Sequence, residues 1–223
     1  HICVVDDGSE DQQYTTDIIN GKFGNIYETR NEEFGIVYVY DKCTFITLEE
    51  SYGPSTARNI GISVTQDFTD YYQILDADDI MRPNKVKTLL ECMMLDPNIG
   101  VSYGDITCLN TETLKENREF REPFSNFRLM QECIVHSGAM ISKNVMLDCL
   151  ENYSVYDPEM RTCEDYDLWI RIAEKYMIFH IAEDLTLVRV QPKNSTATVD
   201  NSIWVKNWNR IREKVAKRET AKQ

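Results

Sequence analysis

The amino-acid sequence predicts an α/β protein whose central sheet is Rossmann-like, largely parallel and flanked by helices. Short β-branched and aromatic runs alternate with stretches of helical periodicity over about the first 100 residues, a succession typical of doubly wound sheets. Two of the strand-like runs lead directly into groups of aspartates, at Asp6–Asp7 and at Asp76–Asp79. Ligands of such sheets bind at the carboxyl ends of the strands. Both acidic groups are therefore candidates for a binding site.

The elements of the first half can be assigned in order. Strands are expected at residues 2–5, 36–40, 44–48 and 71–76, where β-branched and aromatic residues concentrate. A helix is expected at 55–66, with an apolar face made of Ala57, Ile60, Gly61 and Val64. A second helix opens at Pro83, a residue that suits a helix start. Its core stripe would comprise Val86, Leu89, Leu90, Met93 and Met94.

The second half is less regular. Strands are expected at residues 101–110, 138–142 and 178–182, with a polar loop at 117–126. A helix is expected at 164–176, and its apolar face would comprise Leu168, Trp169, Ile172 and Ala173.

The chain ends in an amphipathic basic helix at 204–223, with Trp204, Trp208, Ile211 and Val215 at helical spacing. This stripe is expected to pack on the domain. Alternatively, a basic amphipathic helix can rest on an anionic membrane surface or on a partner.

The composition excludes several classes of protein. The 223 residues carry 24 Lys or Arg and 37 Asp or Glu, a net charge of −13, so long-range attraction to nucleic acid is not expected. The sequence has no apolar run long enough to cross a membrane, which takes about 18 residues. Its seven cysteines form no C-x-x-C pair, which favours reduced thiols over a zinc site or a disulfide framework. These features predict a cytoplasmic protein.

The densest acidic motif comprises Asp76, Asp78 and Asp79. Side chains of a strand alternate between its faces, so Asp76 and Asp78 would point the same way. Neighbouring carboxylates repel one another unless a cation lies between them, and hard oxygen ligands suit Mg²⁺ or Mn²⁺. A solvated acidic turn is the alternative for so short a motif.

Four motifs occur in a fixed order: VVDDGS at 4–9, GPSTARNIG at 53–61, LDADD at 75–79 and EDYDLWIR at 164–171. Together they resemble family 2 of the inverting, non-processive glycosyltransferases, and the resemblance extends from residue 2 to about residue 190. It implies a GT-A fold, a divalent metal and a nucleotide-diphosphate sugar donor, with UDP favoured. It also implies a transferase domain at 1–203, with a nucleotide-binding half at about 1–100 and an acceptor-side half at about 101–203.

The resemblance assigns the nucleotide and the metal to particular residues. Asp7, or alternatively Asp6, would accept the N–H of the nucleotide base, since a carboxylate pairs well with such a donor. A turn in which either aspartate bonds the backbone before Gly8 is the competing interpretation. Arg58 would meet the nucleoside or the diphosphate, or else pair with the acidic cluster. Asp78 would bind the metal directly, and Asp76 would lie nearer the ribose or the metal's water shell.

The same resemblance implies a catalytic base and a sugar site. Asp165 would be the base and Glu164 would hold the acceptor hydroxyl; without the other motifs, both would simply start a helix favourably. Asp79, Ser137 and Gly138 are candidates for contact with the donor sugar or the acceptor. Trp169 could stack on a sugar ring or, alternatively, lie in the core. The acceptor would be a carbohydrate or a lipid-linked molecule, with peripheral membrane contact through the C-terminal helix in the latter case.

The sequence departs from the family pattern in three places. Family members have an earlier strand and a Pro-x-Tyr-Asn turn, so we expect this domain to lack the usual first strand. The family's Asn before the Gly-x-Ser segment is Ser51 or Tyr52 here, and a His in its Arg-x-His segment is Gln191. A non-catalytic or truncated nucleotide-sugar-binding domain of the same fold is therefore the main alternative. A sugar nucleotidyltransferase would need a Gly-rich basic loop, which the sequence does not show.

Overall fold

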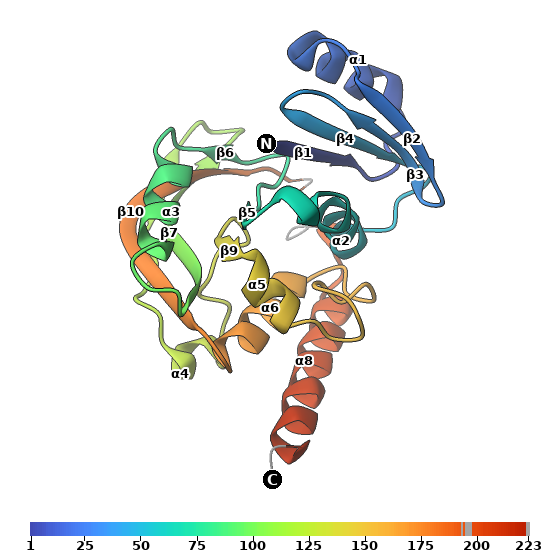
Figure 1. Ribbon diagram of the computed structural model, residues 1–223. Coiled ribbons are helices and arrows are strands. Elements are labelled where there is room, and N and C mark those ends of the chain that lie inside the picture. Colours follow the sequence, from blue (N-terminus) through green and yellow to red (C-terminus); the bar gives the residue numbers. More distant parts are fainter. Residues whose placement is uncertain (193, 195–197, 222–223) are drawn as a thin grey trace. The chain divides into compact units, whose positions relative to one another are not determined.

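The computed structural model describes residues 1–192, 194 and 198–221 and divides into two compact units. The first unit comprises His1–Thr69 together with the short returning segment Tyr156–Arg161. The second comprises Asp70–Val155 and Thr162–Gln223. Figure 1 shows each unit as a sheet with its own helices.

The first unit is built on a sheet with the strand order β1-β4-β3-β2. Strand β1 (Ile2–Asp6) pairs parallel with β4 (Cys43–Leu48). Strands β3 (Gly35–Val39) and β2 (Glu28–Glu32) continue the sheet in antiparallel fashion. Two helices and a 3₁₀ turn complete the unit: α1 (Gln12–Phe23), α2 (Pro54–Thr65) and η1 (Gln66–Phe68).

Helix α2 packs on this sheet through the face that its sequence predicts. Ala57, Ile60 and Val64 contact a cluster of buried strand residues, namely Val37, Ile46 and Leu48. Gly61 lies against β1, since a Cβ there would come within 3.1 Å of Val5 Cγ2. The predicted apolar face of this helix is therefore confirmed.

The second unit contains a sheet with the order β5-β9-β7-β10-β6, and β8 pairs with β7. Its long central strands, β7 (Ile99–Asn110) and β10 (Met177–Val190), run parallel to each other. The pairs β5–β9, β7–β9, β7–β8 and β6–β10 are antiparallel. The shorter strands are β5 (Tyr71–Gln73), β6 (Ile80–Met81), β8 (Glu116–Glu119) and β9 (Met140–Ser142).

The predicted α/β class is confirmed, but the predicted largely parallel sheet is wrong. Among the strands that the structure describes, β1–β4 and β7–β10 are the parallel pairs. Short connections such as residues 40–42 between β3 and β4 explain the difference, because only antiparallel strands can be joined by so few residues. Strand β8 also lies in the segment 117–126 for which a loop was predicted, and β5 ends three residues before Asp76.

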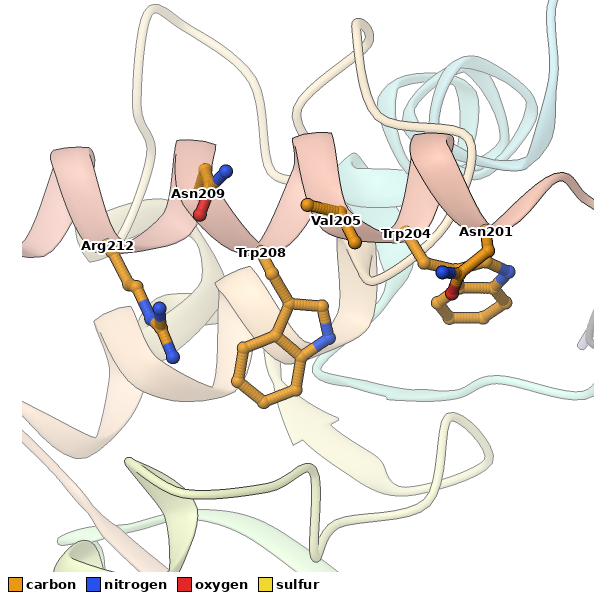
Figure 2. Close-up of a pocket in the computed structure, with 6 residues that line it drawn as sticks. All are labelled: Asn201, Trp204, Val205, Trp208, Asn209 and Arg212. Carbon is orange, nitrogen blue, oxygen red and sulfur yellow. The ribbon is translucent and has the colours of Figure 1, made fainter.

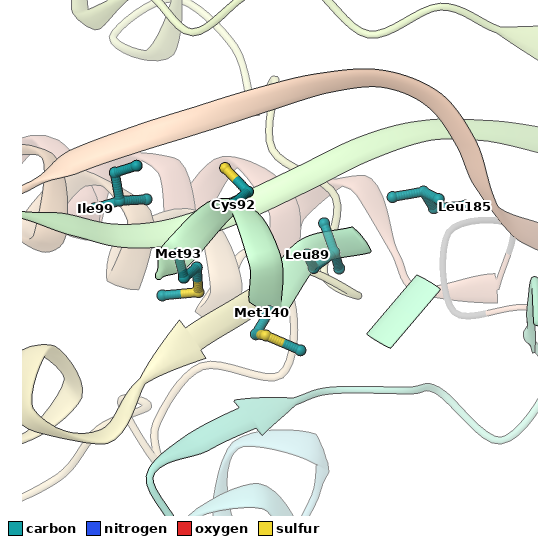
Figure 3. Close-up of a cluster of buried hydrophobic side chains, with 6 residues drawn as sticks. All are labelled: Leu89, Cys92, Met93, Ile99, Met140 and Leu185. Carbon is teal, nitrogen blue, oxygen red and sulfur yellow. The ribbon is translucent and has the colours of Figure 1, made fainter. Parts of the chain in front are cut away.

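Helix α3 (Lys85–Met93) covers one face of the second sheet and contributes to a cluster of buried apolar residues. Figure 3 shows this cluster, made of Leu89, Cys92, Met93, Ile99, Met140 and Leu185. The predicted stripe is wrong at Val86 and Met94, which are 46% and 71% exposed. The buried positions of the helix are Lys85, Leu89, Cys92 and Met93, so the core-facing stripe begins with a lysine.

The described residues of the second unit form four further helices: α4 (Asn126–Leu129), α5 (Lys143–Asp148), α6 (Glu164–Ala173) and α8 (Asn201–Ala221). The predicted apolar face of α6 is confirmed, since Leu168, Trp169 and Ile172 are each 0% exposed. In the part of the chain that the structure covers, no helix has the length and apolarity needed to cross a membrane.

Candidate active site

The two aspartates at the end of β1, in the first unit, accept hydrogen bonds from turn and loop residues. Asp7 accepts hydrogen bonds from Ser51 Oγ at 2.9 Å and from the amides of Tyr52 and Gly53 at 2.8 Å each. It thereby fixes the loop that leads into α2. Asp6 Oδ1 accepts the Ser9 amide at 2.8 Å, while its buried Oδ2 has no hydrogen-bond partner. Both aspartates therefore stabilise the local turn and loop, while Asp6 Oδ2 remains a buried acceptor without a hydrogen bond.

The turn after β1 requires a glycine. Gly8 has a φ of +71°, and a Cβ at this position would lie 2.4 Å from the carbonyl carbon of Glu50. Only glycine combines this left-handed conformation with such a close backbone approach. The VVDDGS motif therefore has a structural cause that is independent of any ligand.

The GPSTARNIG motif lies on α2 and holds the returning segment 156–161. The side chain of Asn59 donates to the Tyr156 carbonyl at 2.7 Å and accepts the Tyr156 amide at 2.9 Å. Ser55 Oγ donates to the Met160 carbonyl at 2.5 Å. The Arg58 guanidinium lies 5.4 Å from the centre of the Tyr156 ring. Asn59 thus ties α2 to this segment, and the Arg58 guanidinium lies against an aromatic face.

The LDADD motif forms a turn in the second unit that is tied to two distant segments. The Asp79 amide donates to the Asp76 carbonyl at 3.0 Å and closes the turn. Ser137 Oγ donates to Asp76 Oδ2 at 3.0 Å. From β10, Arg189 donates to the carbonyls of Asp78 and Ala77. The structure therefore brings together Asp76, Asp78, Asp79, Ser137 and Gly138, which the sequence had placed in one site.

The carboxyl group of Asp79 has a raised pKa. Burial and the charges of Asp76 and Asp78 raise the pKa of Asp79 to about 6. His136 Nε2 lies 3.8 Å from Asp79 Oδ2, and His136 Nδ1 accepts the Gly138 amide at 3.0 Å. Burial and the positive charges of Lys85 and Arg121 lower the pKa of His136 to about 4, so its ring is neutral at pH 7. Clustered carboxylates with one raised pKa are the environment that a divalent cation relieves.

Lys85 is the site residue that the sequence analysis missed. Its side chain is buried, and Nζ donates to Thr186 Oγ1 at 2.8 Å. A Cβ on Gly138 would lie 2.9 Å from the same Nζ, so the lysine and the Gly138 loop are close neighbours. Burial lowers the pKa of Lys85 to about 8, although Asp79 and Asp76 oppose the shift. A lysine at i−4 from Leu89, on the core-facing side of α3, is the signal that could have revealed it.

The donor set suits a hard cation but does not enclose one. Within residues 1–192, 194 and 198–221, no group of three His, Cys, Asp or Glu residues is arranged to hold a metal ion by itself. The turn instead presents carboxylate oxygens, which suit Mg²⁺ or Mn²⁺ when further ligands come from water and phosphate. The residues therefore fit a Mg²⁺ or Mn²⁺ ion that takes its remaining ligands from elsewhere.

Glu164 and Asp165 open helix α6 in the second unit. Three acidic residues occupy the first turn of α6, Glu164, Asp165 and Asp167, where the helix dipole favours ionised carboxylates. Glu164 is buried, whereas Asp165 is half-buried and its Oδ1 accepts the Tyr166 amide at 2.7 Å. The preceding residue, Cys163, has a left-handed φ of +61°, which is uncommon for a residue with a side chain. This segment leaves a carboxylate at the surface on a constrained backbone.

Trp169 does not belong to a sugar site. Its side chain is 0% exposed, so the ring faces the core and no sugar can stack on it. The alternative interpretation, a place in the core, is therefore correct. Trp169 is buried because it lies in the middle of the apolar face of α6, together with Leu168 and Ile172.

Outside these motifs, a shallow pocket lies along one side of α8 (Figure 2). It is lined by Asn201, Trp204, Val205, Trp208, Asn209 and Arg212. None of the residues that the sequence motifs single out lines this pocket.

The mixed sheets with their flanking helices are the architecture of a GT-A type glycosyltransferase. The sequence pattern described as "Glycosyl transferase family 2" matches residues 1–149. The chain belongs to this family.

Curated relatives agree with this membership. The chain is 27% identical over 157 residues to an uncharacterised glycosyltransferase of Methanocaldococcus jannaschii, covering 68% of this chain and 52% of that protein. It is 25% identical over 215 residues to the putative teichuronic acid biosynthesis glycosyltransferase TuaG of Bacillus subtilis, covering 93% and 71%. The chain thus spans about half the length of the archaeal relative.

Solved structures show the same fold. The S. aureus TarS fragment 1–349 in complex with UDP-GlcNAc has a TM-score of 0.62 at 15% identity, covering 89% of this chain and 52% of that one. The same fragment in complex with UDP has a TM-score of 0.58 at 16% identity, covering 85% and 51%.

Proposed function

We propose that this domain is an inverting glycosyltransferase that moves a sugar from a nucleotide-diphosphate donor, with UDP favoured, to an acceptor hydroxyl. The observation that carries the proposal is the Asp76–Asp79 turn, which Ser137 and Arg189 hold in place from two other segments. Such bracing presents carboxylates in a defined geometry, as a phosphate-bound metal requires. Family membership and the donor complexes of the TarS fragment support the choice of a nucleotide sugar.

The nucleotide would be bound by residues of the first unit. Asp6 Oδ2 is a buried acceptor without a partner, and a base imide N–H would satisfy it. Asp7 would contribute through the loop that it fixes, and its own oxygens already accept three donors. Arg58 would face the nucleoside or the diphosphate, since a guanidinium suits phosphate oxygens. The favoured acceptor of the base N–H thus moves from Asp7 to Asp6.

Asp78, with Asp76, would hold Mn²⁺ or Mg²⁺. When bound, such an ion offsets the charge that grows on a leaving diphosphate. Asp79, Ser137 and Gly138 would line the donor sugar or the acceptor, with Ser137 keeping Asp76 oriented. The buried Lys85 ammonium limits the local excess of negative charge while no nucleotide is present.

Asp165 would act as the general base. It would take the proton of the acceptor hydroxyl as that oxygen attacks the anomeric carbon and the bond to the diphosphate breaks. A single displacement of this kind inverts the configuration. Asp165 is half-buried and open to an acceptor, while the buried Glu164 would position the hydroxyl or the helix end.

The acceptor is proposed to be a carbohydrate, in line with the teichuronic acid pathway for which the B. subtilis relative is named. With a lipid-linked carbohydrate, contact with a membrane surface would use the exposed Lys206 and Arg212 of α8. Lys214 and Arg218 would not take part, because both make ion pairs within the protein.

Calorimetric titration tests the donor site with UDP, GDP, CDP and dTDP, each with and without Mn²⁺. We expect UDP to bind only when Mn²⁺ is present. Release of UDP from UDP-GlcNAc, UDP-glucose, UDP-galactose and UDP-glucuronate, with water as acceptor, then identifies the sugar. Metal-dependent UDP binding without UDP release from any donor would favour the non-catalytic domain, and no nucleotide binding by folded protein would contradict the proposal.

A further inference from the structure

Helix α8 contacts the segment that carries Asp165 through polar and charged residues. Its buried positions are Asn207 and Ile211, each 2% exposed, and Lys214 and Arg218 continue the same face one and two turns later. The predicted stripe of Trp204, Trp208, Ile211 and Val215 is therefore correct only at Ile211 as a fully buried position. An apolar stripe alone would suffice to dock a terminal helix, so the buried polar residues call for another explanation.

The first contact lies three residues before Asp165. Asn207 Nδ2 donates to the Thr162 carbonyl at 2.9 Å and to Thr162 Oγ1 at 2.8 Å. All of these groups are buried: Thr162 is 4% exposed and Asn207 is 2% exposed. Between Thr162 and Glu164 the chain passes through Cys163 in the left-handed region. The two hydrogen bonds from Asn207 thus hold the backbone immediately before Cys163, the residue with the left-handed conformation.

The second and third contacts follow Asp165 directly. The Tyr166 ring lies 5.0 Å from the Trp208 ring, and its hydroxyl donates to the Leu129 carbonyl at 2.5 Å. Asp167, which is 0% exposed, accepts from Lys214 Nζ and from Arg171 Nε at 3.0 Å each. Residues 162, 166 and 167 are therefore each held by α8, and Asp165 lies between them. Helices α6 and α8 lie side by side in Figure 1.

Ion pairs of α8 extend these contacts beyond α6. Lys214 also pairs with Glu151 at 2.5 Å, and Arg218 pairs with Glu151 at 3.2 Å and with Glu174 at 2.8 Å. Two cations of α8 thus join both ends of α6 to the segment around Glu151. Geometry of this kind restricts where the first turn of α6 can lie.

We propose that α8 is a positioning element of the active site, in which Asn207 and Lys214 hold the Thr162–Asp167 segment so that the Asp165 carboxylate stays in its productive orientation. This inference rests on the proposed role of Asp165 as base. It makes the C-terminal helix a determinant of turnover. Misplacement of a catalytic group by about 1 Å can lower a rate by roughly 10²-fold.

Two variants test the proposal, Asn207→Leu and Lys214→Met, with Lys217→Met as the matched control on the exposed side of the same helix. The readout is UDP release from whichever of UDP-GlcNAc, UDP-glucose, UDP-galactose and UDP-glucuronate the wild-type protein hydrolyses, assayed well below the unfolding temperature. Rates are normalised to sites that bind UDP and Mn²⁺ by calorimetry. We expect kcat to fall roughly 10- to 100-fold in both variants, with the donor KM and UDP affinity unchanged, and Lys217→Met to match the wild-type protein.

A purely structural role for α8 predicts a different result. It would lower the unfolding temperature of both variants while leaving kcat per UDP-binding site unchanged, and that result would overturn the proposal. If Asn207→Leu does not fold, Lys214→Met gives the same comparison. Hydrogen exchange of peptides covering residues 162–170 provides a readout apart from turnover, and exchange as slow as in Lys217→Met would also overturn the proposal.

Asp165→Asn, measured in parallel, separates this inference from the proposed function. If Asp165→Asn lowers kcat strongly while the two α8 variants keep it, α8 does not position the base but Asp165 remains the base. If Asp165→Asn keeps the wild-type kcat, the base assignment fails and the positioning role fails with it.

Discussion

Ser137 Oγ donates a hydrogen bond to Asp76 Oδ2 at 3.0 Å, across 61 positions of sequence. This contact joins the loop before β9 to the turn after β5, and these two strands pair antiparallel in the same sheet. One carboxylate oxygen of Asp76 is thereby oriented by a hydroxyl group. The bond links a candidate sugar-site residue to a candidate metal-site residue.

Replacement of Ser137 by alanine removes this bond. A typical hydrogen bond is worth about 1 kcal/mol, and one to a charged group more, so we expect UDP affinity in the presence of Mn²⁺ to fall roughly 5- to 20-fold. Calorimetry of UDP with Mn²⁺ measures the change. Ser63→Ala is the control, because the Ser63 hydroxyl is exposed and donates to the Ile60 carbonyl of its own helix. Equal affinities in the two variants would show that Asp76 needs no such orientation.

Asp78→Ala is expected to abolish the metal dependence of nucleotide binding, because it removes the carboxylate proposed to contact the ion. The Asp78 carbonyl would still accept its bond from Arg189, so the turn should persist. Titration of UDP with and without Mn²⁺ gives the answer. Asp67→Asn, which alters an exposed carboxylate of the first unit, serves as a control for the loss of one negative charge. An undiminished Mn²⁺ effect in Asp78→Ala would refute the ligand role.

Asp165→Asn should leave UDP and Mn²⁺ binding intact and lower turnover by roughly 10² to 10⁴, the range for a positioned general base. The amide is nearly isosteric and can still accept the Tyr166 amide bond that Asp165 Oδ1 accepts now. Initial rates of UDP release provide the measurement. A wild-type rate would exclude Asp165 as the base.

Acid should destabilise the second unit through Asp105, a buried residue of β7. Burial alone would raise its pKa, but hydrogen bonds from the Arg121 amide, His180 and Arg118 outweigh burial and lower the pKa of Asp105. A carboxyl whose pKa is lower in the folded than in the unfolded state stabilises the fold above its unfolded pKa, near 4. That stabilisation is lost as the pH falls from about 4 through the folded pKa.

The matching experiment compares urea unfolding midpoints at pH 7 and at pH 3. We expect Asp105→Asn to lose less stability than the wild-type protein over this interval, since it no longer has this carboxylate to protonate. Asp148→Asn is the control: Lys175 and Tyr176 also lower the pKa of Asp148, but this carboxylate is exposed and its pair is solvent-screened. Parallel pH profiles for wild-type protein and Asp105→Asn would contradict the assignment.

Local sequence pattern determined several features of this protein. The order of the four motifs, the helix over Pro54–Thr65 and the helix that begins at Glu164 follow from periodicity, turn residues and helix-start signals, because these depend on neighbours in the chain. The acidic character of the turn at Asp76–Asp79 is likewise local.

Other features depend on which distant segments meet, and only the tertiary structure decided them. The antiparallel pairing of most strands, the burial of Trp169 and Lys85 and the exposure of Val86 and Met94 come from packing partners far away in the sequence. The same holds for the hydrogen bonds that Asn207 and Lys214 donate to residues 162 and 167. Polar residues in a terminal helix are predicted to be exposed, because burying a polar group costs free energy unless the group is hydrogen-bonded or paired with an opposite charge. Whether such a partner is present depends on segments that are distant in the sequence, and the local pattern does not contain them.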